Sequence, residues 1–115
     1  MDKVTLLLRN HPDFAKGRAE AESEIAAGSL GYRIHGKVVW PLCDAAATVL
    51  RERYHVQLQV VGHCIVDIGE AAKAQGYNER MQEEFSRRFA EDVVEIVFRE
   101  VERKRKRGTK RASPG

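Results

Sequence analysis

The chain has few of the residues that mark a disulfide scaffold or a membrane protein. Its two cysteines, Cys43 and Cys64, are too few for a disulfide framework, so we expect reduced thiols. No apolar stretch approaches the roughly 18 residues needed to cross a bilayer. The apolar run near the start, "VTLLL", is shorter than a signal-peptide core of about 7 to 15 residues. The sequence therefore predicts a cytoplasmic protein without a membrane partner.

Motifs for catalysis and cofactor binding are also missing. The sequence contains no CxxC pair, no GxSxG and no glycine-rich phosphate loop, and the two cysteines stand 21 residues apart. Its carboxylates fall mostly on predicted helices, where none stands out as a general acid and base pair. We therefore expect no cofactor and no metal, and we favour a non-enzymatic binding or interaction module over an enzyme.

Acidic residues are absent from the C-terminal end, which divides the chain by charge. Residues 103–115 hold seven of the 20 Lys and Arg residues, so 13 basic and 17 acidic residues remain in 1–102, a net charge of −4. We expect a single domain over 1–102, followed by a basic tail. The seven basic residues of the tail are Arg103, Lys104, Arg105, Lys106, Arg107, Lys110 and Arg111.

Two interpretations of this tail follow from its charge. Seven cations can neutralise phosphates and release counterions, which predicts loose attachment to nucleic acid. Alternatively, the basic residues only complement the dipole at a helix end, Gly108 stops the helix, and a disordered, solvated end follows.

Alternation of apolar and polar residues predicts two strands, near 31–40 and 55–68. In the first, Tyr32, Ile34, Val38 and Trp40 share one face, and Pro41 ends the strand. In the second, the even positions from Val56 to Ile68 are apolar. The odd face of both strands is a candidate ligand-binding surface, although a solvated sheet face or a dimer contact has the same pattern. Its polar members are Arg33, His35, Lys37, Gln57, Gln59 and His63.

The stretch "VQLQVVGHCIVDI" sets His63 beside Cys64 within the second strand. A continuous strand sends neighbouring side chains to opposite faces, so the imidazole and the thiol would be separated. The rival is a hairpin that turns at Gly62. Because the hairpin mixes polar and apolar residues on both faces, we favour the continuous strand and a core position for Cys64.

Helical spacing predicts helices over 12–27 and 42–54, one or two turns closed by Gly76, and helices over 77–90 and 92–107. The segment 4–8 is ambiguous between helix and strand. The segment 93–98 is rich in β-branched residues, but favourable pairs at i,i+4, such as Glu95–Arg99 and Glu100–Lys104, favour a helix.

These elements predict a small α+β domain with helices packed on one face of a short sheet. Two strands alone are marginally stable. A third strand would have to come from 4–8 or 93–98, or a second subunit would complete the sheet, and we therefore expect a homodimer.

Cys43 gives an alternative functional hypothesis. It lies where the first strand gives way to a helix, and a helix N-terminus can lower the pKa of a thiol. A parallel crossover would bring Cys43 toward His63 or His35, as in a thiol-dependent enzyme or metal site. Against this, the carboxylate of Asp44 disfavours a thiolate, and no second cysteine forms a resolving pair.

Overall fold

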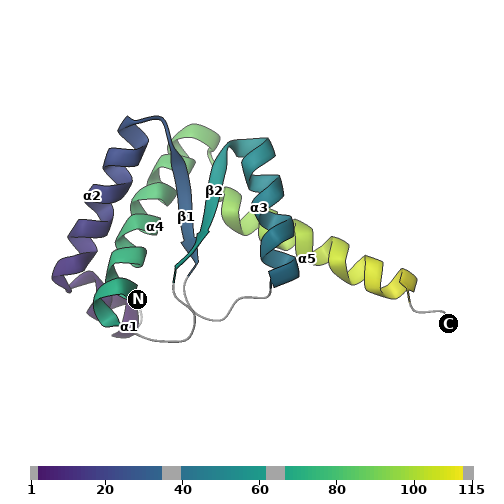
Figure 1. Cartoon of the computed structure of the whole chain (residues 1–115), viewed down its shortest axis with the longest axis horizontal. Coiled ribbons are helices and arrows are strands. Elements are labelled where there is room, and N and C mark those ends of the chain that lie inside the picture. The colour runs from purple at the N-terminus through teal and green to yellow at the C-terminus, as the bar shows by residue number, and fades with distance from the viewer. Residues whose placement is uncertain (1–2, 35–39, 62–66, 113–115) are drawn as a thin grey trace.

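The computed structural model describes residues 3–34, 40–61 and 67–112. They form a small α+β domain, which confirms the expected fold class (Figure 1). The elements in chain order are α1 (Lys3–Arg9), α2 (Pro12–Ala26), β1 (Leu30–Ile34), α3 (Trp40–Tyr54), β2 (Val56–Val60), α4 (Ile68–Phe89) and α5 (Val93–Ala112).

The two strands are parallel neighbours, joined through α3. Leu30 pairs with Val56 and Ile34 with Val60, and the Val61 N–H extends the ladder to the Ile34 carbonyl at 2.9 Å. Helix α4 packs along β1, whereas α3 packs along β2 (Figure 1). The β1–α3–β2 segment is therefore the parallel crossover that a two-residue turn could not make.

The even face of the strands lies on the core, as the alternation predicts for this part of the chain. Leu30 and Val56 are buried, and Tyr32 and Leu58 pack against the same cluster. The opposing side chains come from α2, α3, α4 and α5, so one continuous core joins the sheet to four helices. Its largest fully buried members are Tyr77, Phe85, Leu50, Met81, Val56, Val93 and Val97.

Both strands are shorter than the alternation predicts. Helix α3 already begins at Trp40, and α4 begins at Ile68. The Asp67 carboxylate accepts hydrogen bonds from the N–H groups of Gly69 and Glu70, which starts α4 where the pattern still suggests a strand. The expectation that Ile68 faces inward is thus wrong, because it is 41 % exposed.

The residues on which the His63–Cys64 question depends lie outside the described part of the chain. This includes Gly62, where the rival hairpin would turn. The separation of the imidazole from the thiol therefore stays a prediction.

Helix α4 is continuous, so the expected stop at Gly76 is wrong. Gly76 and Gly17 instead lie where α4 and α2 approach most closely. A Cβ atom on Gly17 would stand 1.9 Å from the Lys73 carbonyl oxygen, and one on Gly76 would stand 2.1 Å from the Phe14 carbonyl oxygen. The absence of side chains at these positions allows the two backbones to touch.

Neither candidate for a third strand pairs with the sheet. Residues 4–8 belong to α1 and 93–98 to α5, so the helical interpretation of 93–98 is confirmed. Within the described ranges the sheet has two strands. None of the helices described there is long and apolar enough to cross a membrane.

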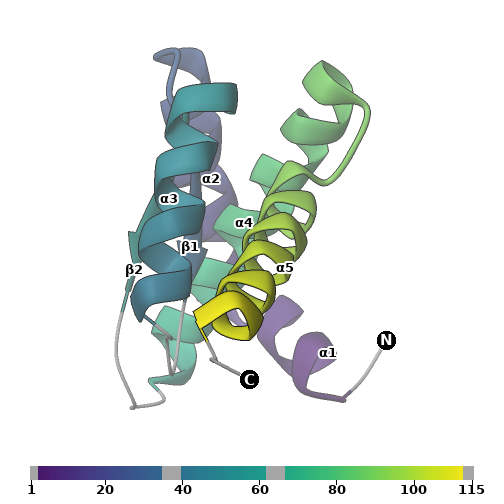
Figure 2. The ribbon, with the colours of Figure 1, turned by 90° about the vertical axis from the view of Figure 1, so that its right-hand side faces the viewer.

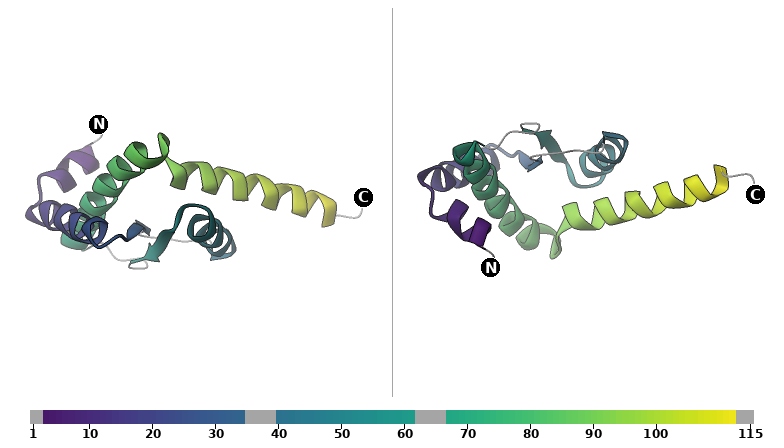
Figure 3. Two further views of the ribbon diagram at one scale, coloured as in Figure 1. Left: turned by 90° about the horizontal axis from the view of Figure 1, so that it is seen from above. Right: turned by 90° about the horizontal axis from the view of Figure 1, so that it is seen from below.

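Helix α5 projects beyond the rest of the molecule (Figures 1 and 3). With α5 included, the molecule measures 54 × 30 × 23 Å along its principal axes. The apolar stripe of Val93, Val97 and Val101 holds the first half of α5 against the core. The helix then continues through Gly108 to Ala112, so the stop expected at Gly108 is wrong. A single glycine costs a helix only about 1 kcal/mol, which a long helix can absorb.

Candidate functional site

The projecting half of α5 presents basic side chains to solvent. Arg103, Lys104, Arg105 and Lys106 are all exposed, and the helix backbone continues through Arg107, Lys110 and Arg111. All seven predicted tail residues therefore belong to one helix.

Pairs of opposite charge one turn apart support this solvated part of the helix. Glu95 pairs with Arg99 as predicted, and the Glu100 carboxylate lies 3.5 Å from the Lys104 Nζ. A further pair joins Glu102 to Lys106 at 3.6 Å. Such pairs each contribute about 0.2–0.5 kcal/mol to an exposed helix, so α5 does not depend on core contacts along its whole length.

Three cations of α5 lie on one side of the helix, which we call the basic face. Arg99, Arg103 and Lys106 follow a spacing of four and three residues and, with Glu102, line a shallow hollow of about 300 Å³. Sequence reasoning missed Arg99 because it lies before the acid-free tail. The spacing of four and three residues from Arg99 to Arg103 and Lys106 is the sequence pattern that places Arg99 on the same helix face as the tail cations.

Two of the three described members of the candidate ligand-binding surface, Arg33 and Gln59, make contacts within the fold. Arg33 and Gln59 are register partners, and the Arg33 Nε donates to the Gln59 Oε1 at 3.4 Å. The Arg33 guanidinium also stacks 3.8 Å from the centre of the Tyr77 ring and forms an ion pair with Glu20 at 2.8 Å. Gln57 on the neighbouring strand is exposed. Arg33 therefore holds α2, β1 and α4 together.

Asn78 and Tyr77 on α4 make further hydrogen bonds next to Arg33. Asn78 on α4 clamps the Arg33 backbone, accepting from its N–H at 2.7 Å and donating to its carbonyl at 2.6 Å. The Tyr77 hydroxyl donates to Glu24 at 2.7 Å. Burial first, and then the Glu24 carboxylate, raise the pKa of Tyr77 above its ordinary value, so this hydroxyl stays protonated. The network is a structural one.

The remaining members of that surface, His35, Lys37 and His63, lie outside the described residues. Whether the full set binds a ligand stays a prediction.

Cys43 lies in the first turns of α3 and is buried. The histidines that a thiol-dependent site would need are the undescribed ones just named, so the thiol hypothesis also stays a prediction. In the part of the chain that the structure describes, no group of three or more His, Cys, Asp and Glu side chains could hold a metal ion.

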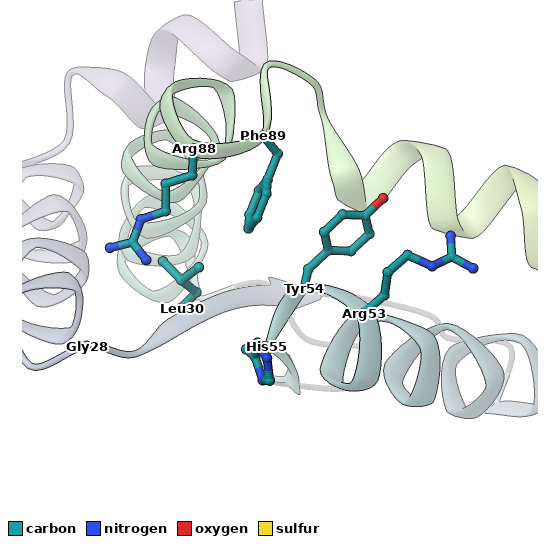
Figure 4. Close-up of a pocket in the computed structure, with 7 residues that line it drawn as sticks. All are labelled: Gly28, Leu30, Arg53, Tyr54, His55, Arg88 and Phe89. Carbon is teal, nitrogen blue, oxygen red and sulfur yellow. The ribbon is translucent and has the colours of Figure 1, made fainter.

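A pocket that the sequence did not suggest lies at the N-terminal ends of the strands (Figure 4). It measures about 350 Å³, and the rings of Tyr54 and Phe89 meet there edge to face at 5.1 Å. The arginines at its border already have carboxylate partners, because Arg53 pairs with Glu100 and Arg88 pairs with Glu84. Three distant segments form this pocket, so no local pattern predicts it.

Comparison of the chain with protein-family models, curated proteins and solved structures found no significant match. The candidate function therefore depends on the residues and their geometry.

Proposed function

We propose that the protein is a small non-enzymatic binding module that attaches to duplex nucleic acid through the basic face of α5. The observation that supports this is the position of the cations. They lie on a helix that continues past Val101, the last buried residue of α5 among the side chains described, and away from the body (Figure 3). A single α-helix fits the major groove of B-form DNA, which is about 12 Å wide.

The acidic body makes this projection necessary. Residues 1–102 have a net charge of −4 and repel phosphates, whereas the tail attracts them. The basic face begins at Arg99 and ends at Lys106, about 7.5 Å beyond Val101 at 1.5 Å per residue. That is close to the screening length of about 8 Å at physiological ionic strength. Phosphates at the far end of the basic face are therefore partly screened from the charge of the body.

The chemistry of α5 favours duplex DNA over other nucleic acids. Residues 99–115 contain no aromatic side chain on which unpaired bases could stack. The major groove of A-form RNA is too narrow for side chains to enter. Contacts from Lys and Arg to phosphates do not depend on sequence, so we expect sequence-tolerant binding.

Neutralising the basic face should weaken DNA binding. We expect the variant Arg99→Gln, Arg103→Gln, Lys106→Gln to lose about tenfold or more in affinity for a 20-base-pair duplex at low salt, because three phosphate contacts are lost. Fluorescence anisotropy measures this. Unaltered binding would contradict the proposal, and equal affinity for single-stranded DNA would exclude the duplex mode.

A matched control separates the basic face from net charge. The variant Lys3→Gln, Lys16→Gln, Arg51→Gln removes three exposed cations from α1, α2 and α3 and changes the total charge equally. Its affinity should stay within about twofold of the parent, because these side chains do not belong to α5. A chain lacking 103–115 should lose binding yet keep its thermal unfolding midpoint, since the deletion begins after Val101.

A further inference from the structure

A largely apolar groove of about 390 Å³ lies between α3 and α5. These two helices lie side by side in Figure 2. The floor of the groove on α3 consists of Leu42, Ala45 and Val49, which follow each other at intervals of three and four residues, one helical stripe. Val101 on α5 forms the facing wall. Leu42 and Val49 are half-buried and Ala45 is exposed, so the stripe continues from the core into solvent.

The rim of the groove is basic. Lys104 and Arg105 line it on α5, and the Lys104 side chain is 70 % exposed. Among the described residues that line the groove, one has a carboxylate, Glu100, and two cations share it: Arg53 at 2.9 Å and Lys104 at 3.5 Å. The positive charges therefore outnumber the negative one along this edge.

We propose that this groove binds an amphipathic helix of a partner protein, with apolar side chains on the Leu42–Val49 stripe and acidic side chains beside Lys104 and Arg105. Helices that dock in grooves present apolar anchors at intervals of three and four residues, which matches the spacing of the floor. The excess of positive charge on the rim selects acidic neighbours for those anchors.

A second copy of this chain is the rival occupant. Helix α1 exposes Val4, Leu6 and Leu7, which are 66 %, 52 % and 56 % exposed. However, the exposed Lys3 at the start of α1 would meet the basic rim with charge of the same sign, whereas Arg9 at the other end already pairs with Glu79. Charge complementarity therefore favours an acidic partner over self-association.

The groove and the basic face lie on opposite sides of α5. Successive residues of an α-helix are about 100° apart, which places Arg103 roughly opposite Val101 and Arg105. A partner helix in the groove would leave the basic face open to nucleic acid. The groove proposal thus stands independently of the proposed DNA binding, and its test uses no nucleic acid.

Three synthetic peptides test the choice of occupant against the full chain. One is a 15-residue amphipathic helix with two Leu anchors and a Glu rim, the second has the same anchors with a Lys rim, and the third is residues 1–11. We expect the Glu-rim peptide to shift the amide resonances of Ala45, Val49 and Val101 and to bind about fivefold or more tightly than the Lys-rim peptide. No binding of the Glu-rim peptide, equal binding of both, or preferred binding of residues 1–11 would overturn the proposal.

Variants locate the binding on the protein. Ala45→Glu places a carboxylate in the groove at an exposed position and should weaken the Glu-rim peptide about tenfold. Ala19→Glu makes the same change at an exposed position of α2 and should leave the affinity within about twofold. Lys104→Glu should reduce the preference for the Glu rim. If Ala45→Glu and Ala19→Glu have equal effects, the groove is not the binding site.

Discussion

Gly76→Ala is expected to lower the free energy of unfolding by about 2–3 kcal/mol, although alanine is the better helix former. Intrinsic propensity alone predicts a gain of about 1 kcal/mol in the middle of a helix. The new Cβ, however, would lie 2.1 Å from the Phe14 carbonyl oxygen and 3.0 Å from the Phe14 carbonyl carbon. These are backbone atoms of α2, so the two helices would have to move apart. Urea unfolding followed by circular dichroism measures the change.

Two further variants test whether contact or conformation causes this loss. Gly17→Ala should cost a similar amount, because its Cβ would meet the Lys73 carbonyl oxygen. The double variant should cost less than the sum of the two, since helices that have separated accommodate the second methyl group. Gly28→Ala is the control, because its φ is +87° but its Cβ meets no atom within 4 Å. This variant should lose only about 1–2 kcal/mol of stability, because alanine is strained in this backbone conformation. A stabilised Gly76→Ala protein would contradict the close helix contact.

Glu84→Gln is expected to destabilise the protein by about 1.5–3 kcal/mol at neutral pH. The Glu84 side chain is only 2 % exposed, and its carboxylate accepts hydrogen bonds from Arg87 and from the Nε of Arg88 at 2.6 Å. Arg80 approaches the same carboxylate at 3.5 Å. Removing its charge leaves these guanidinium groups without their shared partner. Glu83→Gln is the matched control, because Glu83 is exposed and an exposed ion pair contributes at most about 1 kcal/mol.

The effect of Glu84 should also depend on pH. Hydrogen bonds from Arg87 and then Arg88 lower the pKa of Glu84 to about 2, below its ordinary value of 4.5. Because the folded state lowers this pKa, the stabilisation is complete above about pH 4.5 and is lost as the pH falls toward 2. The difference in stability between the parent and Glu84→Gln should therefore shrink to about half or less between pH 7 and pH 3. A constant difference would show that Glu84 stabilises the fold by packing, not by charge.

Local pattern predicts much of this fold. Alternation places Tyr32 and Leu58 on the core face, and helical spacing places Val97 and Val101 on the buried stripe of α5. The same patterns failed where one side chain acts on the backbone or where two distant segments meet. Asp67 starts α4 by accepting N–H groups, which a hydrophobic pattern does not record. Glycine is typical of the end of a helix, but Gly76 lies inside α4, where the helix contacts α2.

The candidate sites also differ in how much of each one the sequence predicts. The acid-free run of residues 103–111 is evident from composition alone and predicts the seven basic residues at the end of α5, but not Arg99. Their division between the basic face and the groove follows from helical spacing over residues 99–106, together with the position of α3 beside α5. The groove itself is lined by Val49 of α3 and Val101 of α5, which are far apart in the chain, so no local pattern predicts it.

The salt dependence of DNA binding tests the central claim most directly, namely that the basic face of α5 neutralises phosphates. The slope of log K against log salt concentration reports how many phosphates are neutralised, at about 0.9 per contact. Between 50 and 300 mM salt, the Arg99→Gln, Arg103→Gln, Lys106→Gln protein should show a slope reduced by roughly 2–3 relative to the parent, and the Lys3→Gln, Lys16→Gln, Arg51→Gln protein an unchanged one. A slope that the α5 variant leaves unchanged, or that the control variant reduces equally, would contradict the assignment of binding to this helix.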